Sequence, residues 1–162
     1  MDSSEAHITT LTCVDEQTGI PHCVSVPTKS PSDGYMVASV CKWLERICRT
    51  KIILRSDGEP AIIKLTGMIK NKRLKEGFET MVQTGPRYSS QSLGAIGAAQ
   101  RLFIGQMRTM RADLELRFGR QILPDHPIFA WMVRHACWLL ERFHLRAGGT
   151  TQFSEAFGHS YR

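Results

Sequence analysis

The feature that most constrains the fold of this chain is its alternation of short strand-like runs with longer helix-like segments. Residues 7–14 and 21–27 are rich in β-branched residues, and the Thr18-Gly19 pair between them is typical of a hairpin turn. Apolar residues then recur at every third or fourth position over residues 35–48, which predicts a helix. The order of these segments predicts an α/β domain, a mixed sheet with helices on its faces.

The rest of the chain continues this pattern. Residues 51–58 and 78–83 contain short apolar runs and predict two more strands, joined by a helix that begins at Glu59-Pro60 and runs to a basic end. The polar, glycine-bearing residues 84–94 predict a loop. Two long helices are predicted over residues 95–118 and 126–144, and residues 145–162 are predicted as loop and turn.

Composition narrows the class of protein and its partners. The hydrophobic fraction of 42% and the charged fraction of 22% are those of a globular chain. A net charge of +6 favours polyanionic partners, nucleic acid first. No apolar run is long enough for a membrane helix, and the polar first ten residues lack the pattern of a signal peptide. The five scattered cysteines predict reduced thiols in an intracellular compartment, nuclear or cytoplasmic.

Asp57 is the most informative single residue. It stands at the carboxyl end of an apolar strand, which is where open α/β sheets place their ligands. Asp2 precedes the first predicted strand, and strand order would allow the two carboxylates to converge. Converging carboxylates are what Mg²⁺ needs. The alternative is that Asp57 is only the N-cap of the helix that begins at Pro60.

The segment Ser92–Gln100, SLGAIGAAQ, has three possible interpretations from its residues. It can be a phosphate-binding glycine loop, the start of the long helix, or a catalytic segment from which one side chain is missing. A dinucleotide-binding motif needs its glycines directly after a first strand and an acid about twenty residues later. Here the segment follows a polar loop late in the chain, and no acid occurs between Glu79 and Asp113.

Four segments together resemble the catalytic core of retroviral and retrotransposon integrases. They are TLTCVDEQTG, KIILRSDGEPAI, YSSQSLGAIGAAQRLFIGQMRTM and WMVRHACWLLERF followed by GGTTQFSEAFG. The resemblance covers nearly the whole chain and keeps the order of the motifs. It implies an RNase H-like fold, a five-stranded mixed sheet flanked by helices. It also implies a core over residues 1–145, with residues 146–162 as a turn-rich extension of the same domain.

The resemblance also implies an Asp, Asp, Glu triad that holds Mg²⁺ or Mn²⁺. Carried onto this sequence, the first acid is Asp2 and the second is Asp57. The glutamate of the family, which begins the long helix in a Ser-x-Gly-x-x-Glu pattern, falls on Gly97. The segment SLGAIG therefore reads best as the start of the integrase helix with its glutamate replaced. Two carboxylates leave more of the metal charge uncompensated than three, so catalysis is expected to be impaired.

Contacts to DNA are predicted at two places. The resemblance places the loop with Tyr88, Ser89 and Gln91 next to the scissile phosphate. The basic run 70–75 and the long helix add possible phosphate contacts, namely Lys70, Lys72, Arg73 and Arg101. Solvated helix faces are the alternative for these basic residues. Trp131, Trp138 and Met107 are predicted as core residues and not as a base-stacking platform.

The favoured function is an integrase-core-like domain that binds DNA, forms a homodimer as the family does, and has lost catalysis. The alternative is an active Mg²⁺-dependent polynucleotidyl transferase whose third ligand has not been recognised. A nucleotide-binding protein that uses the glycines of GAIGAA is a further alternative.

Overall fold

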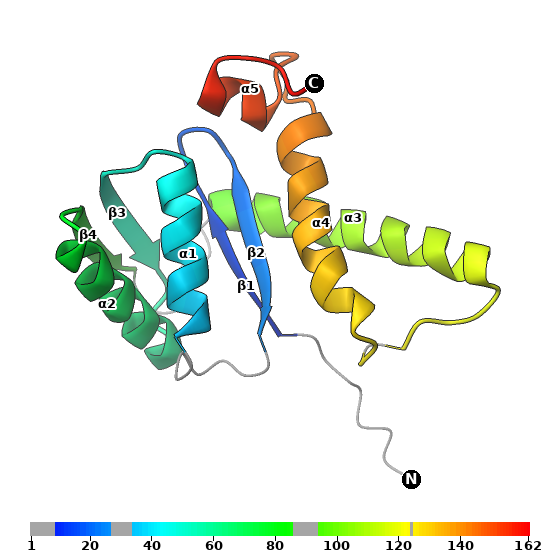
Figure 1. Ribbon diagram of the computed structural model, residues 1–162, viewed down its shortest axis with the longest axis horizontal. Coiled ribbons are helices and arrows are strands. Elements are labelled where there is room, and N and C mark those ends of the chain that lie inside the picture. Colours follow the sequence, from blue (N-terminus) through cyan, green and yellow to red (C-terminus); the bar gives the residue numbers. More distant parts are fainter. Residues whose placement is uncertain (1–8, 27–33, 86–93, 124) are drawn as a thin grey trace, which may run out of the picture. The chain divides into compact units, whose positions relative to one another are not determined.

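A computed structural model describes residues 9–26, 34–85, 94–123 and 125–162 (Figure 1). The chain divides into two compact units. Residues 1–27 and 96–162 form one unit, called here the hairpin unit, and residues 28–95 form the other, called the parallel-sheet unit. Residues 146–162 therefore group with the hairpin that lies more than a hundred residues earlier in the sequence.

The hairpin unit is built on strands β1 (Thr9–Val14) and β2 (Pro21–Val26), which pair antiparallel. The Asp15 carboxylate organises the turn between them, because it accepts hydrogen bonds from the Thr18 backbone N–H at 3.1 Å and the Thr18 hydroxyl at 2.6 Å. Gly19 follows with φ at 75°, a conformation that glycine adopts at no steric cost. The hairpin predicted from Thr18-Gly19 is confirmed.

Helices α3 (Gly94–Phe118) and α4 (Ile128–Phe143) supply the core of this unit. Helix α4 packs against β2, as Figure 1 shows. Buried residues recur at three- and four-residue spacing along α4, so they lie together on one apolar face of the helix. The main cluster consists of Cys23, Phe103, Val133, Ala136, Cys137 and Leu140, with Met107 and Met110 packed against it.

A short helix near the C-terminus was not predicted from the sequence. Helix α5 (Gln152–Phe157) lies in a segment predicted as loop and turn. Thr151 is its N-cap, and the Thr151 hydroxyl accepts a hydrogen bond from the Ser154 backbone N–H at 3.1 Å. The Ser154 hydroxyl in turn accepts one from the Thr151 N–H at 3.1 Å. This reciprocal cap satisfies two backbone donors and stabilises a helix too short to persist by propensity alone.

The parallel-sheet unit contains helix α1 (Tyr35–Arg46), strand β3 (Lys51–Ser56), helix α2 (Pro60–Lys75) and strand β4 (Glu79–Thr84). Strands β3 and β4 pair in parallel, with Lys51 opposite Glu79 and Ser56 opposite Thr84. Helix α2 is the crossover between them, packs against β4, and contacts α1. A helical crossover is what a parallel pair requires, since the chain must return to the same edge.

The α/β class is confirmed, but the predicted five-stranded sheet is not what the described residues form. They contain four strands in two two-stranded sheets, one antiparallel and one parallel. The short turn after β1 makes β1 and β2 antiparallel, and the long crossover after β3 lets β3 and β4 run parallel. Within the described part of the chain, no helix has the length and apolar character to cross a membrane. All five cysteines are free thiols.

Candidate functional site

Asp57 lies where the sequence predicted it, directly after β3 and ahead of α2. Its carboxylate is exposed, and Oδ1 accepts a hydrogen bond from the Glu59 backbone N–H at 3.3 Å. The N-cap of α2 is Glu59, so the interpretation of Asp57 as the N-cap is wrong, although Asp57 does order the turn before the helix. The neighbouring Ser56 hydroxyl is buried and has no hydrogen-bond partner among the described residues.

Gly97 is the fourth residue of α3 and carries no carboxylate. Gly94 and Gly97 are both helical, and neither has a positive φ. The segment Gly94–Ala99 is therefore the first turns of a helix and not a phosphate-binding loop, which leaves the nucleotide-binding alternative without support. Among the described residues, a Cβ added at Gly97 would meet only the Arg101 guanidinium, at 3.8 Å. This position has room for a larger side chain.

Four predicted site residues fall outside the described residues: Asp2, Tyr88, Ser89 and Gln91. Asp57 belongs to the parallel-sheet unit and Gly97 to the hairpin unit. Within residues 9–26, 34–85, 94–123 and 125–162, no three His, Cys, Asp or Glu side chains are close enough to hold a metal ion. Asp57 is the described carboxylate of the predicted site, and Asp2 lies outside the described residues, so the described residues alone do not make up a two-metal centre.

Three of the predicted phosphate contacts have side chains that reach solvent. Lys70 on α2 and Arg101 on α3 are exposed, as a contact to DNA requires. Lys72 is half-buried, and its ammonium lies 3.9 Å from the Glu76 carboxylate one turn later on α2. The charge of Lys72 is therefore partly balanced within the helix.

Arg73 has to be removed from the predicted DNA contacts because it is 0% exposed. Its Nε donates to the Thr80 hydroxyl at 2.9 Å, and its Nη2 donates to the carbonyl of Arg49 at 2.7 Å and of Thr50 at 3.2 Å. The guanidinium also lies over the Phe78 ring, 5.0 Å from its centroid. Arg73 joins α2 to the amino ends of β3 and β4. Burial lowers the pKa of its guanidinium.

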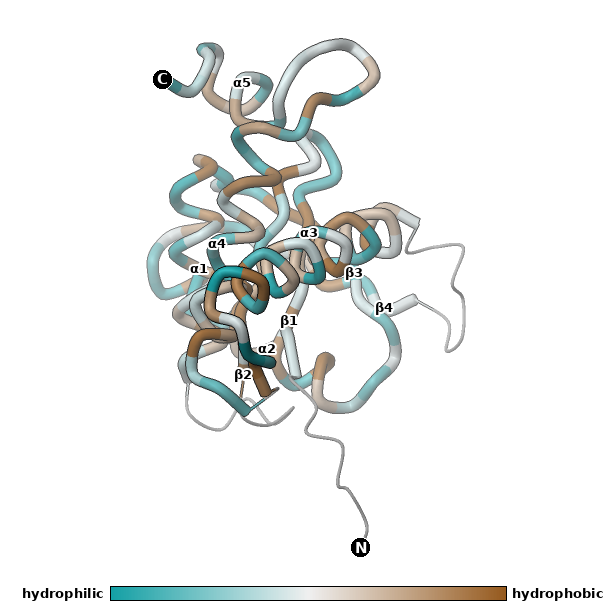
Figure 2. Tube along the Cα trace, turned by 90° about the vertical axis from the view of Figure 1, so that its right-hand side faces the viewer, coloured by the Kyte–Doolittle hydropathy of each residue, from teal (hydrophilic) through white to brown (hydrophobic). Residues whose placement is uncertain are grey.

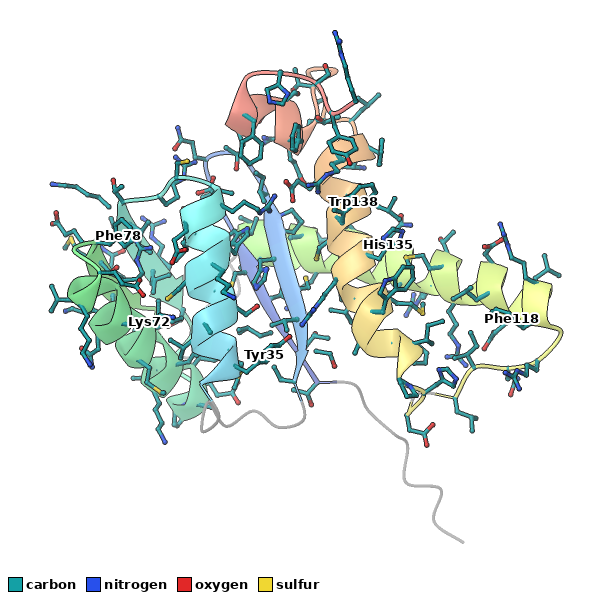
Figure 3. All side chains as sticks on the ribbon, viewed as in Figure 1. Tyr35, Lys72, Phe78, Phe118, His135 and Trp138 are labelled. Carbon is teal, nitrogen blue, oxygen red and sulfur yellow. The ribbon has the colours of Figure 1, made fainter. Side chains whose placement is uncertain are left out.

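The prediction that Trp131 is a core residue is wrong, since it is 55% exposed. Trp131 stacks on His135 with ring centroids 4.5 Å apart, and His135 stacks on the half-buried Trp138 at 5.5 Å. Figure 3 shows His135 and Trp138 along α4. The three rings form an aromatic stack on the side of α4 opposite its buried face. Met107, by contrast, packs against the core as predicted.

Beyond this stack, one arginine joins α4 to the C-terminal segment. The Arg142 guanidinium lies 4.7 Å from the centroid of the Trp138 ring and 4.9 Å from that of Tyr161. It also contacts Phe153 of α5, at 5.3 Å. These cation–π contacts hold the end of the chain on α4.

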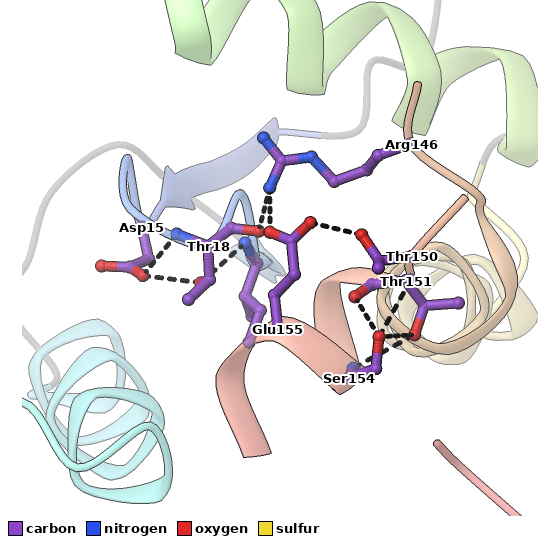
Figure 4. Close-up of polar contacts among 8 residues, drawn as sticks. Asp15, Thr18, Arg146, Thr150, Thr151, Ser154 and Glu155 are labelled. Carbon is purple, nitrogen blue, oxygen red and sulfur yellow. Dashed lines mark hydrogen bonds and ion pairs between the residues drawn. The ribbon is translucent and has the colours of Figure 1, made fainter. Parts of the chain in front are cut away.

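A polar network on the hairpin turn was also missed from the sequence (Figure 4). Arg146 Nη1 donates a hydrogen bond to the Thr18 carbonyl at 3.0 Å and pairs with the Glu155 carboxylate. The Thr150 hydroxyl donates to the other oxygen of Glu155 at 2.6 Å. The network joins residues 128 positions apart, and no local sequence signal reports such a contact.

The buried thiols of the hairpin unit have shifted pKa values. Burial raises the pKa of Cys13 to about 12. A hydrogen bond from Cys137 lowers the pKa of Cys23, whereas the same contact and burial raise the pKa of Cys137. Cys23 and Cys137 are buried in the main cluster and pack as core residues, whereas Cys13 is half-buried.

Similar folds occur among solved protein structures. Neither the protein-family models nor the sequences of curated proteins give a match. Among solved structures, the catalytic core domain of BIV integrase matches with a TM-score of 0.65 and 17% identity, over 92% of this chain and 85% of that one. A chain of the simian T-cell lymphotropic virus intasome, solved in complex with PP2A regulatory subunit B56 gamma, matches with a TM-score of 0.69 and 14% identity. That match covers 94% of this chain and 49% of the other. The resemblance to integrase cores is thus confirmed for the fold.

Proposed function

We propose that this chain is an integrase-core-like domain that binds DNA and is catalytically impaired. The proposal rests on the residue at position 97, which is a glycine and not a glutamate. The fold matches that of an integrase core, and the position that the sequence resemblance assigns to the third carboxylate is a helical glycine beside which, among the described residues, only Arg101 lies within 4 Å of an added Cβ. Without that carboxylate, the pair of acids Asp2 and Asp57 leaves the charge of two Mg²⁺ or Mn²⁺ ions poorly compensated.

DNA is the proposed partner because three independent features favour it. The net charge of +6 attracts polyanions. Lys70 and Arg101 are exposed on two different helices. One of the matching structures is an intasome. Descent from an integrase is therefore part of the proposal. A retroelement origin and a nuclear or cytoplasmic location belong to the same proposal.

The proposed domain organisation is a core over residues 1–145 with residues 146–162 as its extension. The contact between Arg146 and Thr18 supports this organisation, because it joins the extension to the first hairpin.

Homodimerisation is proposed from the resemblance. Light scattering at micromolar concentration measures the oligomeric state, and a strict monomer would contradict the proposal.

The test of impaired catalysis is Mg²⁺- or Mn²⁺-dependent nicking of labelled duplex DNA. The unmodified chain is compared with Gly97→Glu and with Gly97→Ala, which gives the helix the same backbone gain of about 0.5–1 kcal/mol but no carboxylate. We expect nicking from Gly97→Glu alone. Adding Asp57→Asn to that variant should abolish the nicking, because it removes the second acid.

Two outcomes would contradict the proposal. If the unmodified chain nicks DNA and Asp57→Asn abolishes the reaction, the chain is an active polynucleotidyl transferase with another third ligand. If none of the variants binds duplex DNA, as measured separately by fluorescence anisotropy, the proposed partner is wrong.

A further inference from the structure

The positive charge of this chain is not spread evenly. Residues 28–95 carry 12 Lys and Arg against 6 Asp and Glu, which accounts for the whole net charge of +6. The remaining residues carry 9 basic and 9 acidic residues and are neutral overall. In this neutral hairpin unit, several arginines are paired with acids: Arg111 with Glu115, Arg117 with Asp113, Arg142 with Glu141, and Arg146 with Glu155.

Within the parallel-sheet unit, helix α2 presents the unbalanced charge. Its buried side consists of Leu65, Thr66, Ile69 and Arg73. Lys64, Lys70 and Lys75 are exposed on the rest of the helix, and no acid of the described residues forms an ion pair with any of them. Figure 2 shows hydrophilic and hydrophobic residues alternating around the turns of α2. This exposed side is called here the lysine face.

The spacing of the lysine face suits a linear polyanion. Lys64 and Lys75 are eleven residues apart, so they point in nearly the same direction about 16 Å apart along the helix axis. Lys70 lies on the other border of the exposed side. Two other described lysines of the unit are paired: Lys51 with Glu79 at 3.0 Å and Lys72 with Glu76 at 3.9 Å. Lys42 on α1 is also exposed, but among the described elements of the unit α2 is the one that gathers several exposed lysines without an ion pair.

We propose that the lysine face of α2, defined by Lys64, Lys70 and Lys75, is the main surface by which this chain binds the phosphate backbone of duplex DNA. The inference rests on the proposed function and assigns the binding surface within it. It gives α2 a larger part in binding than α3, most of which belongs to the neutral unit. Lysines act as point charges, so the contact carries no sequence preference.

Two features favour a duplex backbone over other polyanions. The lysine face offers no exposed aromatic ring on which unpaired bases could stack, and the nearby Phe78 packs under Arg73. Its apolar area is confined to Ile63, 44% exposed, and Leu74, 67% exposed, since the other apolar residues of the helix are half-buried or buried. An interfacial membrane helix needs a broad apolar face.

The test is duplex binding by fluorescence anisotropy across a salt titration, using a triple variant with Lys64→Gln, Lys70→Gln and Lys75→Gln. A matched control with Arg108→Gln, Arg117→Gln and Arg120→Gln removes the same charge from the neutral unit. Each lost phosphate contact lowers the slope of log affinity against log salt by about 0.9. We expect the lysine variant to lose about 2–3 units of slope and at least tenfold in affinity at low salt. The arginine control should keep most of both.

Further variants and probes separate the possible failures. The triple Lys→Arg variant keeps the charge and should bind like the unmodified chain, and circular dichroism checks the fold of each variant. If the arginine control loses binding and the lysine variant does not, the inference is overturned while the proposed function stands. If the unmodified chain binds no duplex, both fail. Binding to phosphatidylserine vesicles in place of duplex would overturn the inference in favour of a membrane surface.

Discussion

Arg146 Nη1 and the carbonyl oxygen of Thr18 are joined by a hydrogen bond of 3.0 Å, across 128 residues of sequence. The same nitrogen pairs with Glu155, which the Thr150 hydroxyl also contacts. One guanidinium therefore ties the C-terminal segment to the turn of the first hairpin.

Arg146→Gln should loosen this attachment. The ion pair is partly exposed, so we expect a loss of about 1 kcal/mol in the free energy of unfolding and a larger local effect on α5. Hydrogen exchange of the α5 amides should accelerate, while exchange in β3 stays unchanged. Arg162→Gln, which removes the same charge from the chain terminus, is the control. Equal exchange in the two variants would show that the network does not hold α5.

Arg73→Met should destabilise the parallel-sheet unit strongly. It removes three hydrogen bonds and leaves the buried Thr80 hydroxyl and the partly buried carbonyls of Arg49 and Thr50 without their donor, at a cost of about 2–4 kcal/mol. Urea unfolding followed by circular dichroism measures the change. Lys70→Met on the exposed side of α2 is the matched control and should stay within about 0.5 kcal/mol. Similar costs for both variants would contradict the structural role of Arg73.

Glu115 should make stability depend on acid pH. Its Oε1 accepts hydrogen bonds from the Ile122 backbone N–H at 2.8 Å and from Arg111 Nε at 2.9 Å. These contacts, the backbone one first, lower the pKa of Glu115 below its ordinary value of 4.5. A lowered folded-state pKa gives a stabilisation that is present above the unfolded value and is lost as pH falls through the folded value.

Glu115→Gln should therefore show a flatter fall in thermal stability below pH 4.5 than the unmodified chain. The two melting curves should converge at the acid end of the titration, where Glu115 is protonated. A constant difference in melting temperature across the whole pH range would mean that the carboxylate charge is not what matters.

Cys48→Gly should stabilise α1. The Cys48 N–H bonds to the Glu45 carbonyl at 2.9 Å and the Arg49 N–H to the Leu44 carbonyl at 3.0 Å, the Schellman pattern that ends a helix. Cys48 has φ at 55°, where a side chain costs about 1–2 kcal/mol and glycine costs nothing sterically. After the entropy cost of glycine, we expect a net gain of about 0.5–1 kcal/mol. Cys48→Ala keeps the strain and should show no gain in melting temperature.

Much of this fold could be predicted from periodicity and turn residues. The Thr18-Gly19 hairpin, the strand before Asp57 and the helix after Pro60 all follow from local signals. Long-range contacts do not leave such signals, which is why the network around Arg146 was missed. The grouping of strands into sheets also depends on non-local pairing, so the predicted five-stranded sheet could not be derived from the runs themselves.

The errors at Arg73 and Trp131 were avoidable in principle. Leu65, Ile69 and Arg73 follow one another at four-residue spacing, which aligns Arg73 with the buried stripe of α2. Composition alone made the run 70–75 look like a solvated face. On α4, the buried stripe contains Met132, Ala136 and Leu140, and Trp131 lies off it. In both helices the angular position of the residue decided its environment, and the residue type did not.

The open space beside Gly97 has a consequence for the history of the gene. Among the described residues, the Arg101 guanidinium is the one group within 4 Å of a Cβ built at Gly97. Two of the glycine codons, GGA and GGG, become glutamate codons by one transition at the second base. Under the proposed function, a single nucleotide change would therefore restore the carboxylate at position 97.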